Sequence, residues 1–313
     1  MLENLAFSFG VTGPIFLIIL TGITLKRVGL INNEFARLGS DLAFKVAMPC
    51  LLFTKLIDVS FSNPPLFLLG YALAATVATF VLLEWLAAGW LPQNDRSAFV
   101  QGAFRGNMGI VGLAFALNAY GDKILPVASV YIAAMTILFN VLSLITLNRH
   151  LPVENRGSPV LILLKKISSN PLIIAIVMAL LVSWQGIPVP DMMLKTMDYF
   201  AAMALPLALL CGGAAIRWRE FHSSVNLYWG TLAKLVLVPG LIVTVGVLLG
   251  IRGESLGVLF FMTAAPTASA SYPMIRSMGG NHYLAAALIA LTSLLSVVAV
   301  TAGLFLLREL GLA

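Results

Sequence analysis

The sequence contains little charge. Only 10% of its 313 residues are Asp, Glu, Lys or Arg, whereas 60% are hydrophobic and the mean hydropathy is +0.98. These values exclude a soluble globular domain, in which about 25% of residues carry charge. Long apolar runs separated by short polar breaks indicate helices that cross a hydrocarbon core of about 30 Å. The runs do not alternate every second residue, so they do not predict the strands of a membrane barrel.

The sequence also contains few residues for catalysis or metal binding. Its three histidines, His150, His222 and His282, fall in the expected connections between helices. The motifs H-E-x-x-H and G-x-S-x-G are absent, as is the nucleotide-binding motif G-x-x-x-x-G-K-[ST]. Cys50 and Cys211 lie inside apolar runs, where small buried hydrophobic side chains are expected. We therefore predict neither an enzyme nor an ATP-driven pump, and no metal site or cofactor.

Ten apolar runs are present, and each is expected to form a transmembrane helix. They cover residues 7–25, 42–57, 66–91, 98–120, 124–147, 171–187, 192–216, 227–251, 256–278 and 283–307. Glu3 rather than a basic residue precedes the first run, which we interpret as a retained helix and not a signal peptide. The predicted fold class is an all-α integral membrane protein.

The two halves of the chain resemble each other. Three residues recur 157 positions later, since Pro14, Gly29 and Pro49 match Pro171, Gly186 and Pro206. This recurrence predicts a five-helix repeat over residues 1–150, a cytoplasmic linker over 151–170 and a second five-helix repeat over 171–313. Because five is an odd number, the second repeat must enter the membrane inverted. Inverted repeats are common in transporters that work by alternating access.

Basic residues are distributed unevenly between the two sides of this topology. Most Lys and Arg residues outside the runs lie in the odd-numbered connections, and the opposite side has only Lys123, Lys195, Arg252 and Arg308. The positive-inside rule then places the odd-numbered connections in the cytoplasm and both termini outside. The same topology explains the formal net charge of +6, so we expect a lipid bilayer and no nucleic acid as a partner. The expected location is the cytoplasmic (inner) membrane of a bacterium.

Two runs contain residues that weaken a helix in the middle of the membrane. Gly106, Gly109 and Gly112 are spaced by three in the fourth run, and the ninth run contains Pro266 and Pro273. Either the helices break there, or the glycines allow close helix packing and the prolines are tolerated kinks. A break would expose N–H groups at a half-helix N-terminus, which favour an anion.

The fourth run also supplies the most specific resemblance. Asn107 followed by spaced glycines and closing on Tyr120-Gly121 resembles the auxin efflux carrier family, whose bacterial members include malonate and malate carriers. The likeness extends to Met48-Pro49, to Leu205-Pro206 with Gly212-Gly213, and to Ala265-Pro266 with Tyr272. Ala114 departs from the family, which often has proline there, so the fourth helix would have to break on glycine alone.

The resemblance implies ten helices in two inverted five-helix repeats, with helices four and nine broken and crossing. Helices one, two, six and seven would form a scaffold that could also make a homodimer, and the other six would move as an elevator. The implied substrate-binding residues lie at the crossing and are Asn107, Gly109, Gly112, Pro266, Thr267, Ser269, Ser271 and Tyr272. The alternative role for Asn107 is a hydrogen bond to a neighbouring helix, and hydroxyls in apolar helices often bond to their own backbone.

Several charged residues also fall within or beside apolar runs. Arg105 and Arg276 are expected either to extend to the cytoplasmic surface or to guide an anion inward. Glu84 and Lys234 occupy equivalent helices of the two repeats, so they could form a structural pair, or Glu84 could couple transport to protons. Separately, Asp41 and Lys45 are expected to form a local ion pair one helical turn apart.

The function predicted from these features is secondary transport of a small organic anion by alternating access. The resemblance favours dicarboxylates such as malonate or malate. Two alternatives remain open, an anion channel and a carrier of another small solute such as an aromatic monocarboxylate.

Overall fold

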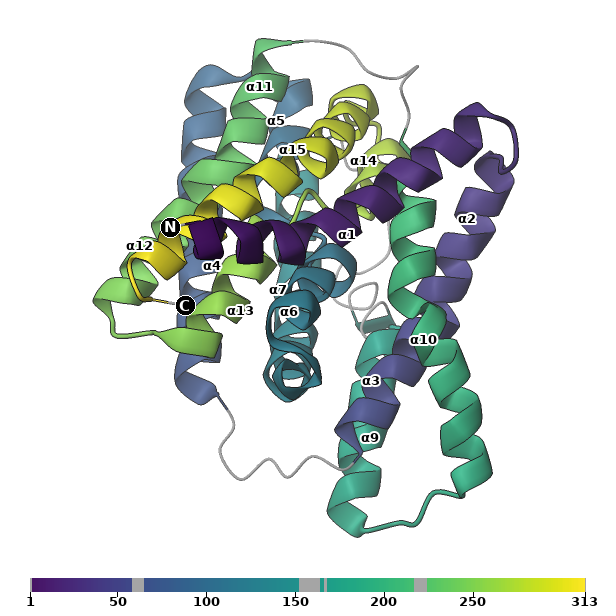
Figure 1. The fold of residues 1–313 in the computed structure, drawn as a ribbon. Helices are drawn as coiled ribbons and strands as arrows, with labels where there is room; N and C mark the ends of the chain where they lie inside the picture. Colours follow the sequence, from purple (N-terminus) through teal and green to yellow (C-terminus); the bar gives the residue numbers. More distant parts are fainter. Residues whose placement is uncertain (1, 58–64, 152–163, 166–167, 217–223, 313) are drawn as a thin grey trace.

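The structure is a computed structural model that describes residues 2–57, 65–151, 164–165, 168–216 and 224–312. Its described elements are all helices, and every expected apolar run is helical over most of its length (Figure 1). Most of the proposed linker 151–170 lies outside the described residues, as do Arg217, Arg219 and His222.

In the first half, several runs are built from more than one helical piece. The elements are α1 (Leu2–Arg27), α2 (Asn33–Leu42), η1 (Ala43–Ala47), α3 (Met48–Leu56), α4 (Leu66–Trp90), α5 (Gln93–Phe104), η2 (Met108–Gly112), α6 (Leu113–Tyr120), η3 (Asp122–Ile124) and α7 (Leu125–His150). The second run therefore begins earlier than residue 42. The cause is Asn32, whose side chain accepts a hydrogen bond from the Phe35 N–H at 2.8 Å and caps α2.

The second half also contains both continuous and divided helices, although its π-helical turn lies in the eighth run and not in the seventh. Its elements are α9 (Pro171–Gln185), α10 (Asp191–Ala214), α11 (Val225–Leu232), η5 (Ala233–Leu237), α12 (Val238–Leu248), α13 (Gly253–Ala264), α14 (Ser271–Ser277) and α15 (His282–Glu309). The π-helical turns η1 and η5 each end two residues before a proline, Pro49 and Pro239. A wider turn at this point accommodates the hydrogen bond that proline cannot donate.

Six described helices are long and apolar enough to cross a membrane. They are Leu2–Arg27, Leu66–Trp90, Asp122–His150, Asp191–Ala214, Val225–Leu248 and His282–Glu309. Shorter apolar helices cover Met108–Tyr120, Pro171–Gln185 and Gly253–Ala264. Two of these shorter helices belong to the fourth and ninth runs, which are divided at the points where the sequence predicted breaks.

The helices form two groups linked by α1. In Figure 1, α2, α3, α9 and α10 lie together on one side, whereas α4, α5, α11, α12, α13 and α15 lie on the other. Helix α1 packs against α10 and against α15. Its contact with α10 is very close, because a Cβ atom at Gly22 would overlap the Leu210 carbonyl and one at Gly213 would overlap the Ile19 carbonyl. Small residues allow membrane helices to approach in this way.

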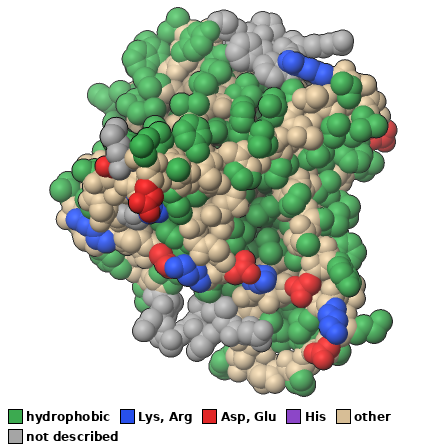
Figure 2. All heavy atoms as spheres, viewed as in Figure 1, with side chains coloured by type: hydrophobic (Ala, Val, Ile, Leu, Met, Phe, Trp, Pro, Cys, Tyr) green, Lys and Arg blue, Asp and Glu red, His purple; other side chains and the backbone are tan. Residues whose placement is uncertain are grey.

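The outer surface is apolar. Figure 2 shows one face covered mainly by hydrophobic side chains, with most of its charged side chains towards the lower edge. Large apolar side chains are exposed along the helices, among them Trp85 (72% exposed), Trp184 (82%) and Leu248 (79%). A surface of this kind matches lipid rather than water. The chain is therefore a multi-pass membrane protein.

Candidate functional site

The two divided runs meet at their breaks. After α5 the backbone of Arg105 is extended (φ −87°, ψ 100°), and after α13 the backbone of Ala265 is extended (φ −54°, ψ 142°). The N–H of Asn107 donates to the Pro266 carbonyl at 2.7 Å, and the N–H of Ala268 donates to the Arg105 carbonyl at 2.9 Å. These bonds form an antiparallel bridge between Gly106 and Thr267. Each break thus provides a partner for a backbone group that the other break frees, which lowers the cost of burying these groups in a membrane.

Thr267 fixes the second break from within the protein. It is 1% exposed, its N–H donates to the Thr292 hydroxyl at 3.0 Å, and its own hydroxyl donates to the Gly102 carbonyl at 2.7 Å. The Thr267 hydroxyl, which the family resemblance assigned to substrate binding, therefore links the segment after α13 to α5. Pro266 is buried in the same bridge, and its carbonyl accepts the bond from Asn107.

The three spaced glycines of the fourth run have different surroundings. A Cβ atom at Gly112 would lie 3.2 Å from both the Met262 sulfur and the Phe261 carbonyl oxygen, so this glycine allows close packing on α13. At Gly109 a Cβ atom would make only ordinary contacts, 3.6 Å from Leu172 of α9 and 4.0 Å from Ile132 of α7. Gly109 thus faces α9 and α7, and a Cβ atom there has room.

The remaining predicted binding residues lie at both breaks and differ in exposure. Asn107 is half-buried and forms the N-terminal boundary of η2, with φ −79° and ψ 57°. Ser269 is exposed, whereas Ser271 is 1% exposed and its hydroxyl has no hydrogen-bond partner among the described residues. Arg276 is exposed and donates to the Tyr272 hydroxyl at 2.9 Å. Asn107 and Ser269 therefore lie close to the bridge and are accessible to solvent.

Arg105 does not extend to the membrane surface, contrary to one expectation from the sequence. It is 8% exposed, and its guanidinium donates to the Ser143 hydroxyl at 3.0 Å, to the Asn140 side-chain oxygen at 3.2 Å and to the Met274 sulfur at 2.9 Å. The expectation failed because the helix ends at Phe104, so the side chain turns inward towards α7 and α14. A buried cation is the result.

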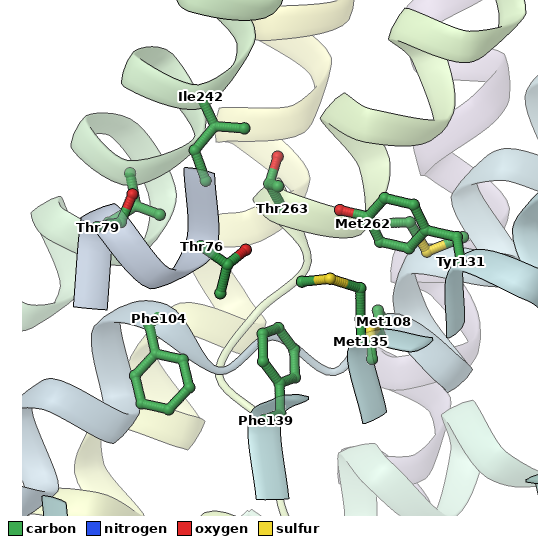
Figure 3. A pocket seen from close by; sticks show the side chains of 11 residues that line it. Thr76, Thr79, Phe104, Met108, Tyr131, Met135, Phe139, Ile242, Met262 and Thr263 are labelled. Atoms are coloured by element: carbon green, nitrogen blue, oxygen red, sulfur yellow. The ribbon is translucent and has the colours of Figure 1, made fainter. Parts of the chain in front are cut away.

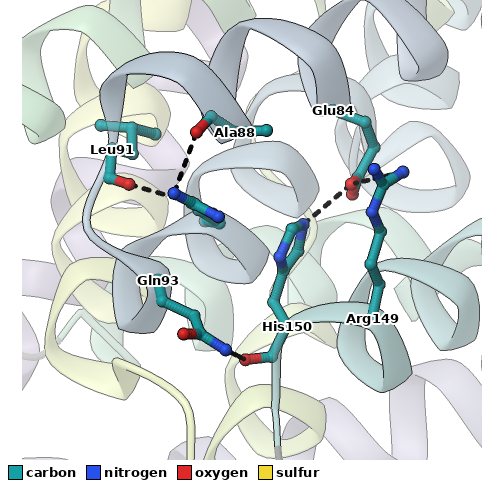
Figure 4. Close-up of polar contacts among 7 residues, drawn as sticks. Glu84, Ala88, Leu91, Gln93, Arg149 and His150 are labelled. Carbon is teal, nitrogen blue, oxygen red and sulfur yellow. Dashed lines mark hydrogen bonds and ion pairs between the residues drawn. The ribbon is translucent and has the colours of Figure 1, made fainter.

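Glu84 does not pair with Lys234, contrary to the other expectation. Its carboxylate lies 2.8 Å from Nε2 of His150 and 3.7 Å from the Arg149 guanidinium (Figure 4). Glu84 and His150 are 2% and 5% exposed, and the Gln93 side chain bonds to the His150 carbonyl at 3.4 Å. His150 is the last residue of α7 and not part of a connection, so the prediction from the sequence was wrong. His282 likewise begins α15. The expected pair between Asp41 and Lys45 is confirmed at 2.9 Å.

A buried polar surface connects the Glu84 pair with Arg105. Polar residues occur every three or four positions along two helices. They are Ser97, Gln101 and Arg105 in α5 and directly after it, and Asn140, Ser143, Thr146 and His150 in α7. Both side-chain atoms of Gln101 and the hydroxyls of Ser97 and Thr146 have no hydrogen-bond partner among the described residues. This spacing was visible in the sequence, because residues three or four apart share a helix face. Apart from Arg105, none of these residues was among the predicted site residues.

Lys234 also lies next to the bridge, because a Cβ atom at Gly106 would be 3.1 Å from its ammonium nitrogen. It is 1% exposed, and its ammonium donates to the Thr263 carbonyl at 2.8 Å, close to the end of α13. Among the described residues neither Lys234 nor Arg105 forms an ion pair with a carboxylate within 4.0 Å. The bridge is therefore flanked by two buried cationic side chains.

A small cavity is lined by residues close in sequence to the bridge, Phe104 and Met108 in the fourth run and Met262 and Thr263 in the ninth (Figure 3). Its volume is about 10 Å³, which is about the space that one water molecule requires. Tyr131 and three methionines line it together with Thr76 and other side chains that come from α4, α5, η2, α7, α12 and α13. The Tyr131 hydroxyl, which has no hydrogen-bond partner among the described residues, is one of its few polar groups. As it stands, this cavity is too small for an organic anion.

The fold and the paired breaks define a class of protein. Two divided helices that meet at a buried point are typical of membrane transport proteins. Residues 12–303 match the family model described as "Membrane transport protein", and the chain belongs to this family, the auxin efflux carrier family.

Individual relatives agree with this assignment. The chain is 23% identical over 275 residues to the uncharacterized transporter YfdV of Escherichia coli, which covers 84% of this chain and 86% of that protein. It is 20% identical over 267 residues to the uncharacterized transporter MJ1031 of Methanocaldococcus jannaschii, which covers 81% of this chain and 84% of that protein. Neither name states a substrate.

Proposed function

We propose that this protein is a secondary carrier of small organic anions, with dicarboxylates such as malonate or malate as substrates. The observation that carries the proposal is the bridge between Gly106 and Thr267, flanked by the buried cations Arg105 and Lys234. Two positive charges without a described carboxylate partner attract an anion to this depth of the membrane. No enzymatic step is part of the proposal.

The start of η2 and α6 supplies the direct contacts. These elements form one apolar helix, Met108–Tyr120, whose first N–H groups have no acceptor within the helix. Asn107 lies at that end and is half-buried, and Gly109 leaves space beside it. A carboxylate there would accept bonds from backbone N–H groups and from the Asn107 amide. Because these donors carry no full charge, the substrate could also leave again.

The proposed transport cycle uses two inverted five-helix repeats. Helix α1 packs against α10, and α3 packs against α9, so helices of the scaffold implied by the resemblance contact one another across the two halves. The other helices would carry the bridge from one side of the membrane to the other as a unit. We place the protein in a bacterial inner membrane with both termini outside, and propose that the scaffold also supports a homodimer.

The first test is uptake of labelled malonate, malate and an aromatic monocarboxylate into proteoliposomes that contain the purified protein. The assay is run with and without an imposed pH gradient. We expect saturable uptake of a dicarboxylate and its exchange against unlabelled substrate inside. Uptake that rises linearly with concentration and shows no exchange would indicate a channel, and no uptake of any acid would refute the anion proposal.

The site is tested with two asparagines of the same segment. Asn107→Ala should abolish saturable uptake, whereas Asn118→Ala should retain it, because the Asn118 amide donates to the Val11 carbonyl at 3.0 Å and lies at the far end of α6. Membrane insertion and thermal stability are measured for both variants. Equal uptake by the Asn107 variant and the wild type at equal expression would disprove the site.

A further inference from the structure

Lys234 occupies a position where a free cation could bind. It belongs to the π-helical turn η5, and its side chain reaches the last turn of α13, where it donates to the Thr263 carbonyl at 2.8 Å. The last carbonyls of a helix lack partners within the helix and carry the negative end of its dipole. A cation at this position is therefore favourable even without a carboxylate.

Two other carbonyl groups of this segment lie near the same point. A Cβ atom at Gly106 would lie 3.1 Å from the Lys234 ammonium nitrogen, 3.1 Å from the Met262 carbonyl oxygen and 3.5 Å from the Ala265 carbonyl oxygen. The ammonium, the end of α13 and the first break thus meet in one small volume. Carbonyl oxygens are the ligands by which unwound helices of transporters hold sodium ions.

No described acidic side chain explains the lysine. The buried carboxylate of Glu84 is engaged by His150 at 2.8 Å. Lys234 is 1% exposed, so water at the surface does not solvate its charge. A buried charge without a partner is costly, and it is retained only where backbone dipoles or a function compensate for it.

We propose that the Lys234 ammonium is a tethered cation that fills a monovalent-cation site formed by the carbonyl end of α13. A free cation is then unnecessary at this position, and the carrier works without sodium or potassium there. Removing the side chain beyond Cβ leaves the carbonyl groups in place and opens the site to a free cation. The statement about transport rests on the proposed carrier function, whereas the statement about the cation site does not.

The space that a free cation needs is next to an existing cavity. Met262 and Thr263 contribute to the site and also line the cavity of about 10 Å³, together with Val238 from the helix that follows η5. Lys234→Ala would extend this cavity to the carbonyl groups. Ammonium and methylammonium match the lost group in charge and in hydrogen-bond donors, so they are the best probes.

The first experiment measures thermal unfolding of the purified protein in detergent. Wild type, Lys234→Ala and Lys195→Ala are compared in ammonium, methylammonium, sodium, potassium and choline chlorides at equal ionic strength. Lys195 is an exposed lysine of α10 and serves as the matched control. We expect a lower Tm for Lys234→Ala in choline and a saturable rise, on the order of 5 °C, in at least one small cation. Wild type and Lys195→Ala should show no such rise.

A second variant keeps the inference falsifiable if Lys234→Ala is too unstable to purify. Lys234→Met fills the space with an apolar side chain of similar length, so its Tm should be lowered and should not respond to any cation. A Tm for Lys234→Met equal to that of the wild type would overturn the inference. The same holds if choline stabilises Lys234→Ala as well as ammonium does.

The transport arm uses the same variants in proteoliposomes. Anion uptake by the wild type should be unchanged when sodium and potassium are replaced by choline. Uptake by Lys234→Ala should be lost in choline and restored by the cation that raises its Tm. If the wild type transports no anion, the proposed function fails while the thermal measurement still decides on the cation site. If sodium or potassium stimulates the wild type more than about twofold, the tethered cation does not replace a coupling ion.

Discussion

The break at residues 105–107 and the break at residues 265–270 share one backbone bridge, but their side chains differ. The first break is short and contains Gly106. Its cationic side chain, Arg105, belongs to the break itself and bonds to α7. The second break contains Pro266 and is exposed at Ser269. Its neighbouring cationic side chain is Lys234, which belongs to η5. The same geometry can therefore be built from residues of different kinds. At both breaks a freed carbonyl group accepts a hydrogen bond from the other break, and a cationic side chain lies nearby.

The largest effect should come from overfilling the first break. Gly106→Val would place atoms against the Lys234 ammonium and the Met262 carbonyl, so we expect a loss of stability of about 1–3 kcal/mol and of all uptake. Ala270→Val in the exposed part of the second break should change stability by less than about 0.5 kcal/mol. The free energy of unfolding of both purified variants, measured by denaturation, tests whether the first break is more closely packed than the second. Equal losses would refute the comparison.

The next effect should come from the donor network of the second break. Thr292→Val keeps the side-chain shape but leaves the buried N–H of Thr267 without its acceptor, which should cost about 1 kcal/mol. Thr196→Val is the matched control, because its exposed hydroxyl bonds to the Met192 carbonyl one turn earlier and to no other group that the structure describes. The two are compared by their unfolding midpoints. A control as destabilised as Thr292→Val would mean that any threonine loss has this effect.

A smaller effect on stability is expected when the charge of the first break is removed. Arg105→Gln retains an amide that can donate to Asn140 or Ser143, and a buried charge without a carboxylate partner contributes little net stability, so the loss should be below about 1 kcal/mol. The KM for the anion should rise by about tenfold, the equivalent of one charge-assisted interaction of about 1.4 kcal/mol. Initial uptake rates at varied substrate concentration measure it. An unchanged KM would leave Arg105 with a structural role only.

The smallest effect on stability should come from Gly109→Ala. The added methyl group makes only ordinary contacts at 3.6 and 4.0 Å, and alanine favours a helix over glycine, so stability should change by less than about 1 kcal/mol. If substrate approaches beside Asn107, the same methyl group should still lower its affinity. Competition between labelled and unlabelled substrate compares the variant with the wild type. Unchanged affinity would place the substrate elsewhere along the bridge.

The positions of the breaks could be predicted from the sequence, because glycine and proline act on the backbone wherever they occur. The absence of proline at Ala114 did not prevent the first break, since Gly106 and Gly112 fit closely against α13. The partners of the charged side chains could not be predicted. Glu84 reaches His150, and Arg105 reaches Asn140, only because particular faces of α4, α5 and α7 meet. Spacing along one helix does not determine which face of another helix lies opposite.

The bridge between Gly106 and Thr267 also has a consequence for biosynthesis. Its two strands are 161 residues apart in the chain, so at about 5–20 residues per second a ribosome needs roughly 8–32 s to make the second after the first. During that interval an open break would leave backbone groups unsatisfied in lipid, at a cost of several kcal/mol each. We expect the fourth run to enter the membrane as a closed helix and to open only when the ninth arrives. Protease or cysteine-labelling experiments on chains truncated before Pro266 would detect an early break. The bridge would then form late in membrane insertion, and the bond from the Thr267 N–H to Thr292 would follow once α15 is in place.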